Sequence, residues 1–303
     1  MIRLALLLLV YCPLCACASA LKQHAVVVDN HEFALWHKQV KSPRATVLLL
    51  HGRTYSSLPD FDLRVPGEDL SFMDGLNDLG YEVYALDARG YGKTPRDASG
   101  WLTPDRAVQD AIGIIQWIKR RTGQPLHVYG WSYGSMVTQL VAQRQPELMS
   151  SIILFGYPFD PGRHVISSDQ VYPAKPPAKK NTRSHAISDF VTSGAISDKA
   201  IKAYADAALK SDPIRVDFRN LHEWQEMDAR KISTPTLLLQ AEFDPIAPTA
   251  IQQALFTNIS TSKKWWVVLA GGDHAALLET PRQEMLNAMD AFMRSLSPFL
   301  SPL

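Results

Sequence analysis

The sequence predicts an α/β fold in which a mostly parallel, doubly wound sheet carries an inserted helical lid. Short apolar stretches alternate with helical stretches between residues 45 and 155 and again from 235 to 296. Repeated strand–helix units of this kind place helices on both faces of a parallel sheet. Residues 157–230 lack this alternation, contain a proline-rich loop and include enough aromatic residues for a packed segment. We therefore expect a sheet domain built from residues 21–156 and 231–303, with a helical lid at 157–230 between its two parts.

The expected strands are of two kinds. The first two mix apolar with polar side chains, as edge strands with one wet face do. The later ones are largely apolar, which is typical of strands buried on both faces of a parallel sheet. In chain order, the expected strands cover residues 25–28, 32–40, 45–51, 81–86, 126–129, 150–155, 235–240 and 264–269.

Helices are expected where apolar residues recur three or four positions apart. The clearest helix begins at Pro104, where Thr103 supplies a capping hydroxyl, and Gly123 follows its end. Gly80 ends an earlier helix. The expected helices cover residues 69–79, 104–121, 135–145, 184–193, 197–209, 248–256 and 282–296.

Composition indicates a folded domain that is large enough to bury a core. The chain has 303 residues, of which 46% are hydrophobic, and its 31 basic residues nearly balance 30 acidic ones. No basic stripe interleaved with aromatic residues is visible, so we expect no nucleic-acid partner. All three cysteines lie at positions 12–17, which leaves no disulfide and no thiolate zinc site in the rest of the chain. His-Glu-x-x-His and acidic calcium-loop patterns are also missing, so we expect no metal and no cofactor.

The first 20 residues have the pattern of an export signal. A basic start at Arg3 precedes the apolar run Leu4–Val10, which is too short to span a membrane. Ala18-Ser19-Ala20 matches the cleavage signal of a secretory peptide and would leave Leu21 as the first residue. Alternatively, the stretch that ends at Cys17 resembles the lipobox of bacterial lipoproteins, which would make Cys17 the lipidated first residue. We expect an exported protein, periplasmic or secreted, and the second route would anchor it to a membrane.

One short stretch carries the chemistry. Residues 130–134 read Gly-Trp-Ser-Tyr-Gly and lie between an expected strand and an expected helix. Such a junction holds its serine on a sharp turn, with the hydroxyl exposed at the carboxyl edge of the sheet. Glycines flank the serine because the turn brings neighbouring backbone too close for a Cβ. We predict that Ser132 is a nucleophile.

A base and an acid are expected at the same edge of the sheet. His274 follows the last expected strand and Asp244 follows the one before it, and ligands of parallel sheets bind at the carboxyl ends of the strands. A serine hydroxyl needs a base that accepts its proton, and a carboxylate fixes the tautomer of that base. The order Ser132, Asp244, His274 fits a nucleophile elbow. Asp160 and Asp273 are the alternative candidates for the carboxylate that orients the histidine. Asp273 is disfavoured because it is adjacent to His274 in the chain.

These residues together resemble the α/β-hydrolases. The resemblance runs over residues 51–296 and rests on a set of ordered motifs: His51-Gly52, Asp-x-Arg-Gly-x-Gly at 87–92, Gly-x-Ser-x-Gly at 130–134, Asp244 and Asp273-His274. It implies an oxyanion hole made by two backbone N–H groups. One would belong to Tyr133, which follows the nucleophile, and the other to Arg53, which follows the His-Gly pair. The residues from Arg53 onward differ from the small or apolar run that is often seen in relatives.

Other polar residues are expected to have structural roles. We expect Asp87 to anchor a loop, His51 to pack and hydrogen-bond beside the oxyanion loop, and His127 to lie in the core or on the surface of the sheet. Asn258 begins an Asn-Ile-Ser glycosylation sequon, which a bacterial lipoprotein would not use.

The leading hypothesis is an exported serine hydrolase that cleaves a carboxylic ester through an acyl-enzyme. An amide or peptide hydrolase of the aminopeptidase type is the alternative enzyme. Relatives of that type bind the substrate amine through acidic lid residues, and Glu223, Glu226 and Asp228 are candidates, although a solvated face suits them better. For either enzyme we expect a small-molecule ester or amide as the substrate. The third hypothesis is a non-catalytic envelope binding protein with the same fold.

Overall fold

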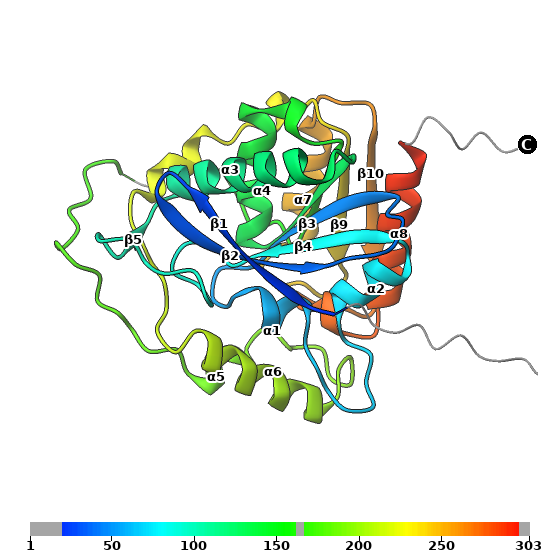
Figure 1. Ribbon diagram of the computed structural model, residues 1–303, viewed down its shortest axis with the longest axis horizontal. Coiled ribbons are helices and arrows are strands. Elements are labelled where there is room, and N and C mark those ends of the chain that lie inside the picture. Colours follow the sequence, from blue (N-terminus) through cyan, green and yellow to red (C-terminus); the bar gives the residue numbers. More distant parts are fainter. Residues whose placement is uncertain (1–19, 162–166, 297–303) are drawn as a thin grey trace, which may run out of the picture.

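The computed structural model describes residues 20–161 and 167–296. Its main feature is an eight-stranded sheet with helices on both faces (Figure 1). The expected export signal, with Cys17, lies outside the described residues except for Ala20, so export and lipidation stay predictions. No helix among the described residues is long and apolar enough to cross a bilayer.

The sheet has the strand order β1-β2-β4-β3-β6-β7-β9-β10. Strand β2 pairs antiparallel with β1 and β4, and the other neighbouring pairs of this sheet are parallel. The two parts of the expected sheet domain meet where β7 pairs with β9, in a register that sets Ile152 against Thr236. The predicted α/β class is therefore confirmed. The strands are β1 (Lys22–Val28), β2 (His31–Lys38), β3 (Ala45–Leu50), β4 (Tyr81–Leu86), β6 (Leu126–Trp131), β7 (Ser151–Phe155), β9 (Thr236–Ala241) and β10 (Lys264–Leu269).

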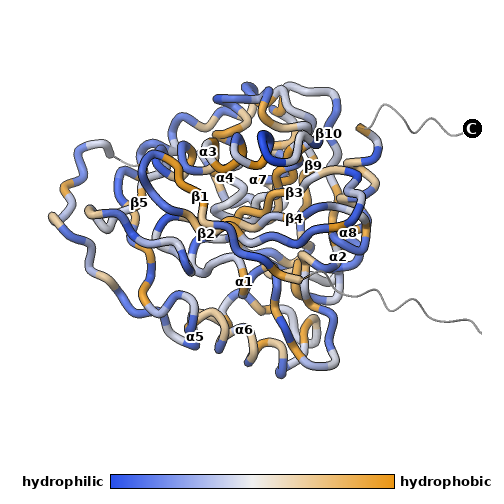
Figure 2. The backbone as a smooth tube through the Cα atoms, viewed as in Figure 1, coloured by the Kyte–Doolittle hydropathy of each residue, from blue (hydrophilic) through white to orange (hydrophobic). Residues whose placement is uncertain are grey.

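Two hydrophobic cores cover the two faces of the sheet. One core contains buried residues of α3, α4 and α7, and the other contains buried residues of α1, α2, α6 and α8. Figure 2 shows apolar residues gathered around the central strands. The helices are α1 (Ser57–Phe61), α2 (Phe72–Asp78), α3 (Pro104–Thr122), α4 (Tyr133–Arg144), α5 (Arg183–Ala186), α6 (Asp198–Ser211), α7 (Thr249–Asn258) and α8 (Arg282–Ser295).

Most expected elements are present, with ends that differ by a few residues. The strand expected at 264–269 is β10 itself. The helix expected at 184–193 is wrong beyond its first turn, since α5 ends at Ala186. The backbone N–H groups of Val191 and Thr192 bond to the carboxylate of Asp273 instead of continuing a helix.

Two features have no counterpart among the expected elements. One is the five-residue helix α1, which is too short to show a helical period. The other is a two-stranded parallel sheet that pairs β5 (Trp101–Leu102) with β8 (Asp217–Phe218). Residues 157–230 therefore include one short parallel strand, where the sequence shows no strand pattern.

Residues 157–230, called the insertion below, leave the main sheet after β7 and return to it at β9. The helices α5 and α6 of this segment lie below the sheet in Figure 1. Tyr204 of α6 donates a 2.9 Å hydrogen bond to Asp60 of α1. After α6, the carboxylate of Asp212 accepts from the backbone N–H groups of Ser56 and Gly92, each at 2.8 Å. The insertion is thus bonded to the loops that follow β3 and β4, at the carboxyl edge of the sheet.

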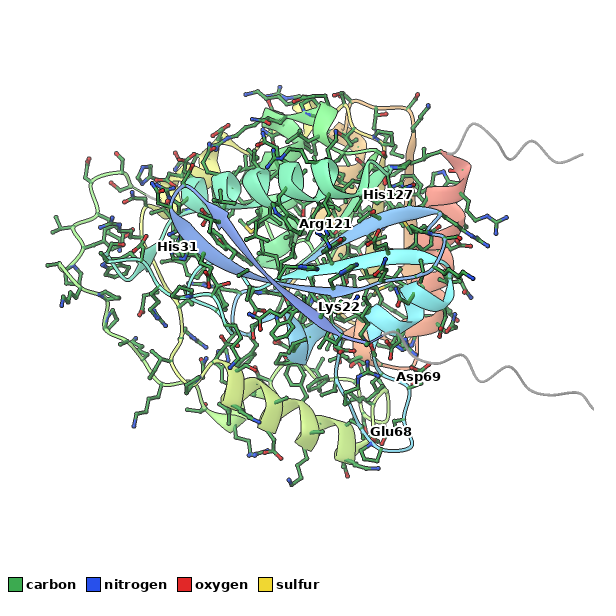
Figure 3. The ribbon with its side chains drawn as sticks, viewed as in Figure 1. Lys22, His31, Glu68, Asp69, Arg121 and His127 are labelled. Atoms are coloured by element: carbon green, nitrogen blue, oxygen red, sulfur yellow. The ribbon has the colours of Figure 1, made fainter. Side chains whose placement is uncertain are left out.

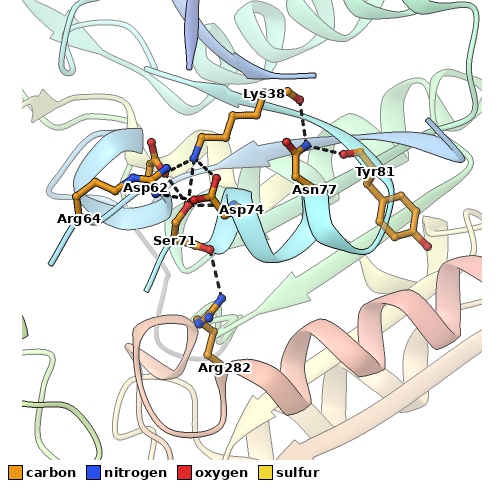
Figure 4. A network of polar contacts seen from close by, with 8 residues as sticks. All are labelled: Lys38, Asp62, Arg64, Ser71, Asp74, Asn77, Tyr81 and Arg282. Atoms are coloured by element: carbon orange, nitrogen blue, oxygen red, sulfur yellow. Dashed lines mark hydrogen bonds and ion pairs between the residues drawn. The ribbon is translucent and has the colours of Figure 1, made fainter. Parts of the chain in front are cut away.

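A buried network of charges joins β2 to α2 (Figure 4). The ammonium group of Lys38 is fully buried and forms ion pairs with Asp62 and Asp74. Arg64, which is half exposed, pairs with the same two carboxylates. The hydroxyl of Ser71 donates to Asp62 over 2.6 Å. Each buried carboxylate therefore has both a cationic partner and a fixed position.

Candidate active site

The turn after β6 has the strained geometry of a nucleophile elbow. Ser132 alone joins β6 to α4, with φ of 53° and ψ of −116°, and residues other than glycine rarely adopt positive φ. A Cβ at Gly130 would lie 2.3 Å from the carbonyl oxygen of Gly134, and a Cβ at Gly134 would lie 2.2 Å from that of Leu50. Side chains are therefore excluded at both glycines, as the pattern predicts.

His274 and Asp244 are hydrogen-bonded to each other. His274 Nδ1 lies 2.8 Å from Asp244 Oδ2, and both side chains are buried. A carboxylate cannot donate, so Nδ1 carries the proton and Nε2 remains as an acceptor. The other oxygen of Asp244 accepts from the backbone N–H groups of Ile246 and Ala247, at 2.8 and 3.0 Å. Burial alone would lower the pKa of His274, but the hydrogen bond and the charge of Asp244 outweigh burial and raise it.

Ser132 and His274 line one cavity of about 490 Å³ at the carboxyl edge of the sheet. The indole N–H of Trp131 donates to the carbonyl oxygen of His274 over 2.8 Å, which ties the histidine loop to the strand that carries the serine. Gly156 keeps space beside the ring, because a Cβ there would lie 2.9 Å from His274 Cε1. The described residues show no hydrogen bond between the Ser132 hydroxyl and His274. Such catalytic contacts often tighten only when substrate binds.

The two rival acids have other partners. Asp273 Oδ2 accepts from the N–H groups of Val191 and Thr192, at 2.8 and 2.7 Å. Asp160 lines a separate cavity of about 650 Å³, whose wall includes neither Ser132 nor His274. Asp244 is therefore the carboxylate that the fold brings to the histidine.

The residues of the expected oxyanion hole, Arg53 and Tyr133, line the same cavity. Tyr133 begins α4, where backbone N–H groups have no partner within the helix. His51 Nε2 accepts from the N–H of Ala88, so its Nδ1 donates to the carbonyl oxygen of Gly52, over 2.7 Å. This bond fixes the peptide plane that carries the Arg53 N–H. Burial lowers the pKa of His51 to about 4, so the ring is neutral at neutral pH. The oxyanion role of both N–H groups stays a prediction.

Several residues that the sequence does not single out form much of the cavity wall: Tyr55, Asp60, Asp189, Tyr204 and Arg215. No sequence signal marks them. The helix α1 is too short to show which of its side chains are buried, and the insertion lacks the strand–helix alternation that locates the other site residues.

Acidic and basic side chains both line the cavity. Burial raises the pKa of Asp60 well above its usual range. Burial also raises the pKa of Asp189, although the nearby positive charge of His274 opposes it. The guanidinium of Arg53 lies 5.0 Å from the centre of the Phe218 ring, and both of these residues line the cavity.

The acidic residues considered for amine binding lie away from this cavity. Glu223 accepts from the backbone N–H of Asp105 at the start of α3, over 2.7 Å. Glu226 pairs with Arg144, and Asp228 pairs with its neighbour Arg230. None of these three carboxylates lines the wall around Ser132.

Two other polar residues have the structural roles that we expect. Asp87 accepts from the backbone N–H groups of Ser57 and Lys93, each at 3.0 Å, and so anchors the loop after β4. His127 is buried in β6 (Figure 3), with its Nδ1 at 2.7 Å from the hydroxyl of Ser151. Within residues 20–161 and 167–296, no cluster of three or more His, Cys, Asp or Glu side chains could hold a metal ion.

Solved structures share this architecture. A soluble variant of monoglyceride lipase from Saccharomyces cerevisiae has a TM-score of 0.69 and 18% identity, over 95% of this chain and 99% of its own. A serine hydrolase involved in carbazole degradation has a TM-score of 0.63 and 18% identity, over 91% of this chain and 100% of its own. The sheet, with its elbow at the carboxyl edge, defines the protein as an α/β-hydrolase. More narrowly, the chain belongs to the Hydrolase_4 family, described as "Serine aminopeptidase, S33", whose model matches residues 41–281.

Curated relatives include enzymes that act on esters. Lysophosphatidylserine lipase ABHD12 of Mus musculus is 24% identical over 235 residues, which is 76% of this chain and 50% of the relative. The chain thus spans about half the length of that relative. The pimeloyl-[acyl-carrier protein] methyl ester esterase of Aeromonas salmonicida is 24% identical over 229 residues, which is 67% of this chain and 82% of the relative.

Proposed function

We propose that the protein is a serine hydrolase that cleaves a carboxylic ester through an acyl-enzyme. The observation that carries this proposal is the buried hydrogen bond between His274 Nδ1 and Asp244. It leaves Nε2 as a proton acceptor on a ring that lines the same cavity as Ser132. Relatives named as a lipase and as a methyl ester esterase support an ester substrate. The insertion forms part of the cavity wall, which supports its role as the lid.

The reaction has two halves. Ser132 Oγ attacks the ester carbonyl carbon while its proton passes to His274 Nε2, and the carbonyl oxygen becomes an oxyanion that the N–H groups of Tyr133 and Arg53 bind. The C–O bond to the alcohol then breaks, and the proton on His274 moves to the departing alcohol. In the second half, water attacks the acyl carbon and gives a proton to His274 Nε2. The bond between the acyl carbon and Ser132 Oγ then breaks, the proton on His274 passes to Ser132 Oγ, and the acid leaves. Asp244 holds the imidazole in one tautomer and stabilises its positive charge.

An amide or peptide hydrolase is the second candidate, because the matched family model carries the name of an aminopeptidase. The acidic residues considered for the amine are occupied by Asp105, Arg144 and Arg230, away from the cavity. The ester is therefore the better match to the geometry. Turnover of aminoacyl-naphthylamides at a higher kcat/KM than short acyl esters would reverse this order.

Removal of the nucleophile tests the proposed function. We expect Ser132→Ala to lower kcat for p-nitrophenyl esters by more than about 10⁴-fold and to abolish labelling by a fluorophosphonate. The matched control is Ser168→Ala, which changes an exposed serine outside the cavity and should label like the parent. A parent protein that is folded but unreactive toward both reagents would favour a non-catalytic binding protein instead.

A further inference from the structure

The loop that contains His274 also contains two buried acids that the proposed reaction does not use. Asp273 directly precedes the histidine, and Glu279 follows the short helix η4 (Ala276–Leu278). Asp273 is 0% exposed and Glu279 is 4% exposed. Oε2 of Glu279 accepts from the backbone N–H of Asp273 over 2.9 Å. Glu279 therefore bonds to the residue next to the catalytic base, although it lies at the other end of the loop.

The hydrogen bonds around the two acids differ. Asp273 Oδ1 accepts from the N–H of Ala275 over 3.0 Å, and its Oδ2 accepts from the N–H groups of Val191 and Thr192. Glu279 Oε1 is buried and has no partner among the described residues. Backbone donors on both oxygens of Asp273 stabilise a negative charge there. Glu279 has a donor on one oxygen only, so a negative charge on it would be less well stabilised.

The two acids have no cationic partner among the described residues. Charged and titratable groups face this part of the loop from four segments: Asp273 and His274 of the loop itself, Asp244 after β9, Asp189 of the insertion and Arg282 of α8. His274 pairs with Asp244, and Arg282 pairs with Asp69. Two unpaired negative charges in a buried place are costly, so we expect one of the two acids to keep its proton.

Glu279 is the acid that suits the protonated state. Burial, together with its interactions with Asp273 and Asp244, raises the pKa of Glu279 to about 8. A protonated carboxyl group donates as well as accepts. Glu279 can then accept the N–H of Asp273 and also donate to the carboxylate of Asp273, with which its side chain interacts. Loss of the proton replaces this attraction with repulsion between two buried carboxylates.

We propose that Glu279 is a positioning residue for ester hydrolysis: its protonated carboxyl group holds the loop that presents His274 to Ser132, and its ionisation loosens that loop and lowers activity. Glu279 does not line the cavity, so it acts through the histidine loop and not on the substrate. The effect on activity rests on the proposed function. The hold on the loop does not, because it depends only on contacts within the fold.

The substitution Glu279→Gln tests this proposal, because glutamine keeps an acceptor and a donor but cannot ionise. We expect kcat/KM of the parent for a butyrate ester to fall above about pH 8. Glu279→Gln should keep most of the parental kcat/KM at neutral pH and lose this alkaline fall. Glu279→Ala removes both polar atoms, so we expect kcat to fall about three- to tenfold at every pH, with KM near the parental value. The control is Glu284→Gln, which changes an exposed glutamate of α8 and should keep the parental pH profile.

The free energy of unfolding gives a measurement that needs no catalysis. The pKa of Glu279 is raised from its ordinary value of 4.5 to about 8, so between these pH values the folded state binds a proton that the unfolded chain has released. This proton should make the stability of the parent fall as pH rises through that range. Glu279→Gln carries no such proton. We therefore expect urea unfolding to show that its stability relative to the parent increases from about pH 5 to pH 8.

Each measurement can overturn the proposal. A parental kcat/KM that does not fall above about pH 8, or an alkaline limb that is the same in the parent and in Glu279→Gln, would rule out the positioning role while the ester hydrolase stands. A stability difference that stays constant over the pH range would show that Glu279 does not hold the proton. Failure of the parent on every ester, with no fluorophosphonate labelling, would overturn the proposed function and the positioning role with it, even where the stability difference depends on pH.

Discussion

At the scale of single residues, two histidines of the site, His274 and His51, have pKa values that are shifted in opposite directions. His274 donates from Nδ1 to a buried carboxylate, and its pKa is raised. His51 has no carboxylate partner among the described residues, and burial lowers its pKa to about 4. The first ring can therefore take up and release a proton, whereas the second stays neutral and holds backbone. The sign of each shift follows from the partner that the ring has.

The raised pKa of His274 predicts the pH dependence of activity. A general base must be neutral, so kcat/KM should fall on the acid side with an apparent pKa above the ordinary 6.5. Asp244→Asn removes the charge that raises the pKa, so we expect the acid limb to move to lower pH. The same variant should lower kcat by about 10⁴-fold, because the amide no longer selects the correct tautomer. Rates of acid release from a butyrate ester, measured between about pH 5 and pH 9, check both effects. An acid limb that stays in place in Asp244→Asn would show that another group sets it.

Prediction from sequence succeeds for residues whose place follows from a strand end. Ser132 directly follows β6, whereas Asp244 and His274 lie in the loops that follow β9 and β10. An apolar run and its end therefore suffice to bring all three to one edge of the sheet. Tyr55, Asp60 and Asp189 follow no such rule. Their positions depend on how the insertion packs against α1, and a contact between segments far apart in the chain leaves no local pattern.

At the scale of elements, the insertion is bonded to the loop that contains His274. The carboxylate of Asp273, next to His274, accepts from the N–H groups of Val191 and Thr192. The N–H of Thr280 donates to the carbonyl oxygen of Ala195 over 2.8 Å. The segment that presents Asp189 to the cavity is therefore bonded to the loop that contains His274. These bonds also use the backbone N–H groups of Val191 and Thr192 outside any helix, which a helical period in the sequence could not reveal.

Weakening the hydrogen bonds from Val191 and Thr192 to Asp273 should change KM more than kcat. In Asp273→Asn, one of the two carboxylate oxygens becomes an NH₂ group, which cannot accept from backbone N–H groups. We expect faster amide hydrogen exchange at Val191 and Thr192, by about tenfold, and a higher KM. Asp97→Asn is the control, since Asp97 also accepts from backbone N–H groups, those of Ser99 and Gly100, in a loop whose residues do not line the cavity. Equal exchange rates at Val191 and Thr192 in the parent and in Asp273→Asn would show that the Asp273 carboxylate does not hold this segment.

At the scale of the whole molecule, the order of the sheet follows from the sequence in part. Alternating strands and helices predict a parallel sheet, and the apolar strands predict burial on both faces. The pairing order is not in that pattern, because β3 lies between β4 and β6 only through crossovers that a single sequence does not display. The buried charges of Figure 4 are likewise hidden. From sequence alone, a lysine in a strand of mixed polar and apolar residues is expected to face solvent, whereas in the structure Lys38 of β2 is buried and paired with Asp74 of α2.

That lysine gives a test of global stability. Lys38→Met leaves the buried carboxylates of Asp62 and Asp74 without their shared ammonium, and only the half-exposed Arg64 remains. We expect the free energy of unfolding to fall by about 3 kcal/mol. The control, Lys41→Met, changes an exposed lysine and should lie within about 0.5 kcal/mol of the parent. Urea unfolding followed by circular dichroism measures both. Equal losses in the two variants would show that the network adds no stability of its own.

The cavity wall contains residues of both hydrophobic cores, which has a consequence for how the protein can change. Met136 and Phe218 belong to one core, whereas Tyr55 and Tyr204 belong to the other, on the opposite face of the sheet. A substitution that reshapes one wall disturbs packing in the core behind that wall. The core behind the other wall, on the opposite face of the sheet, keeps its packing. Preference for one half of a substrate can therefore drift without resetting preference for the other. Evolution, or a directed library, can therefore vary the two walls separately and combine changes in both.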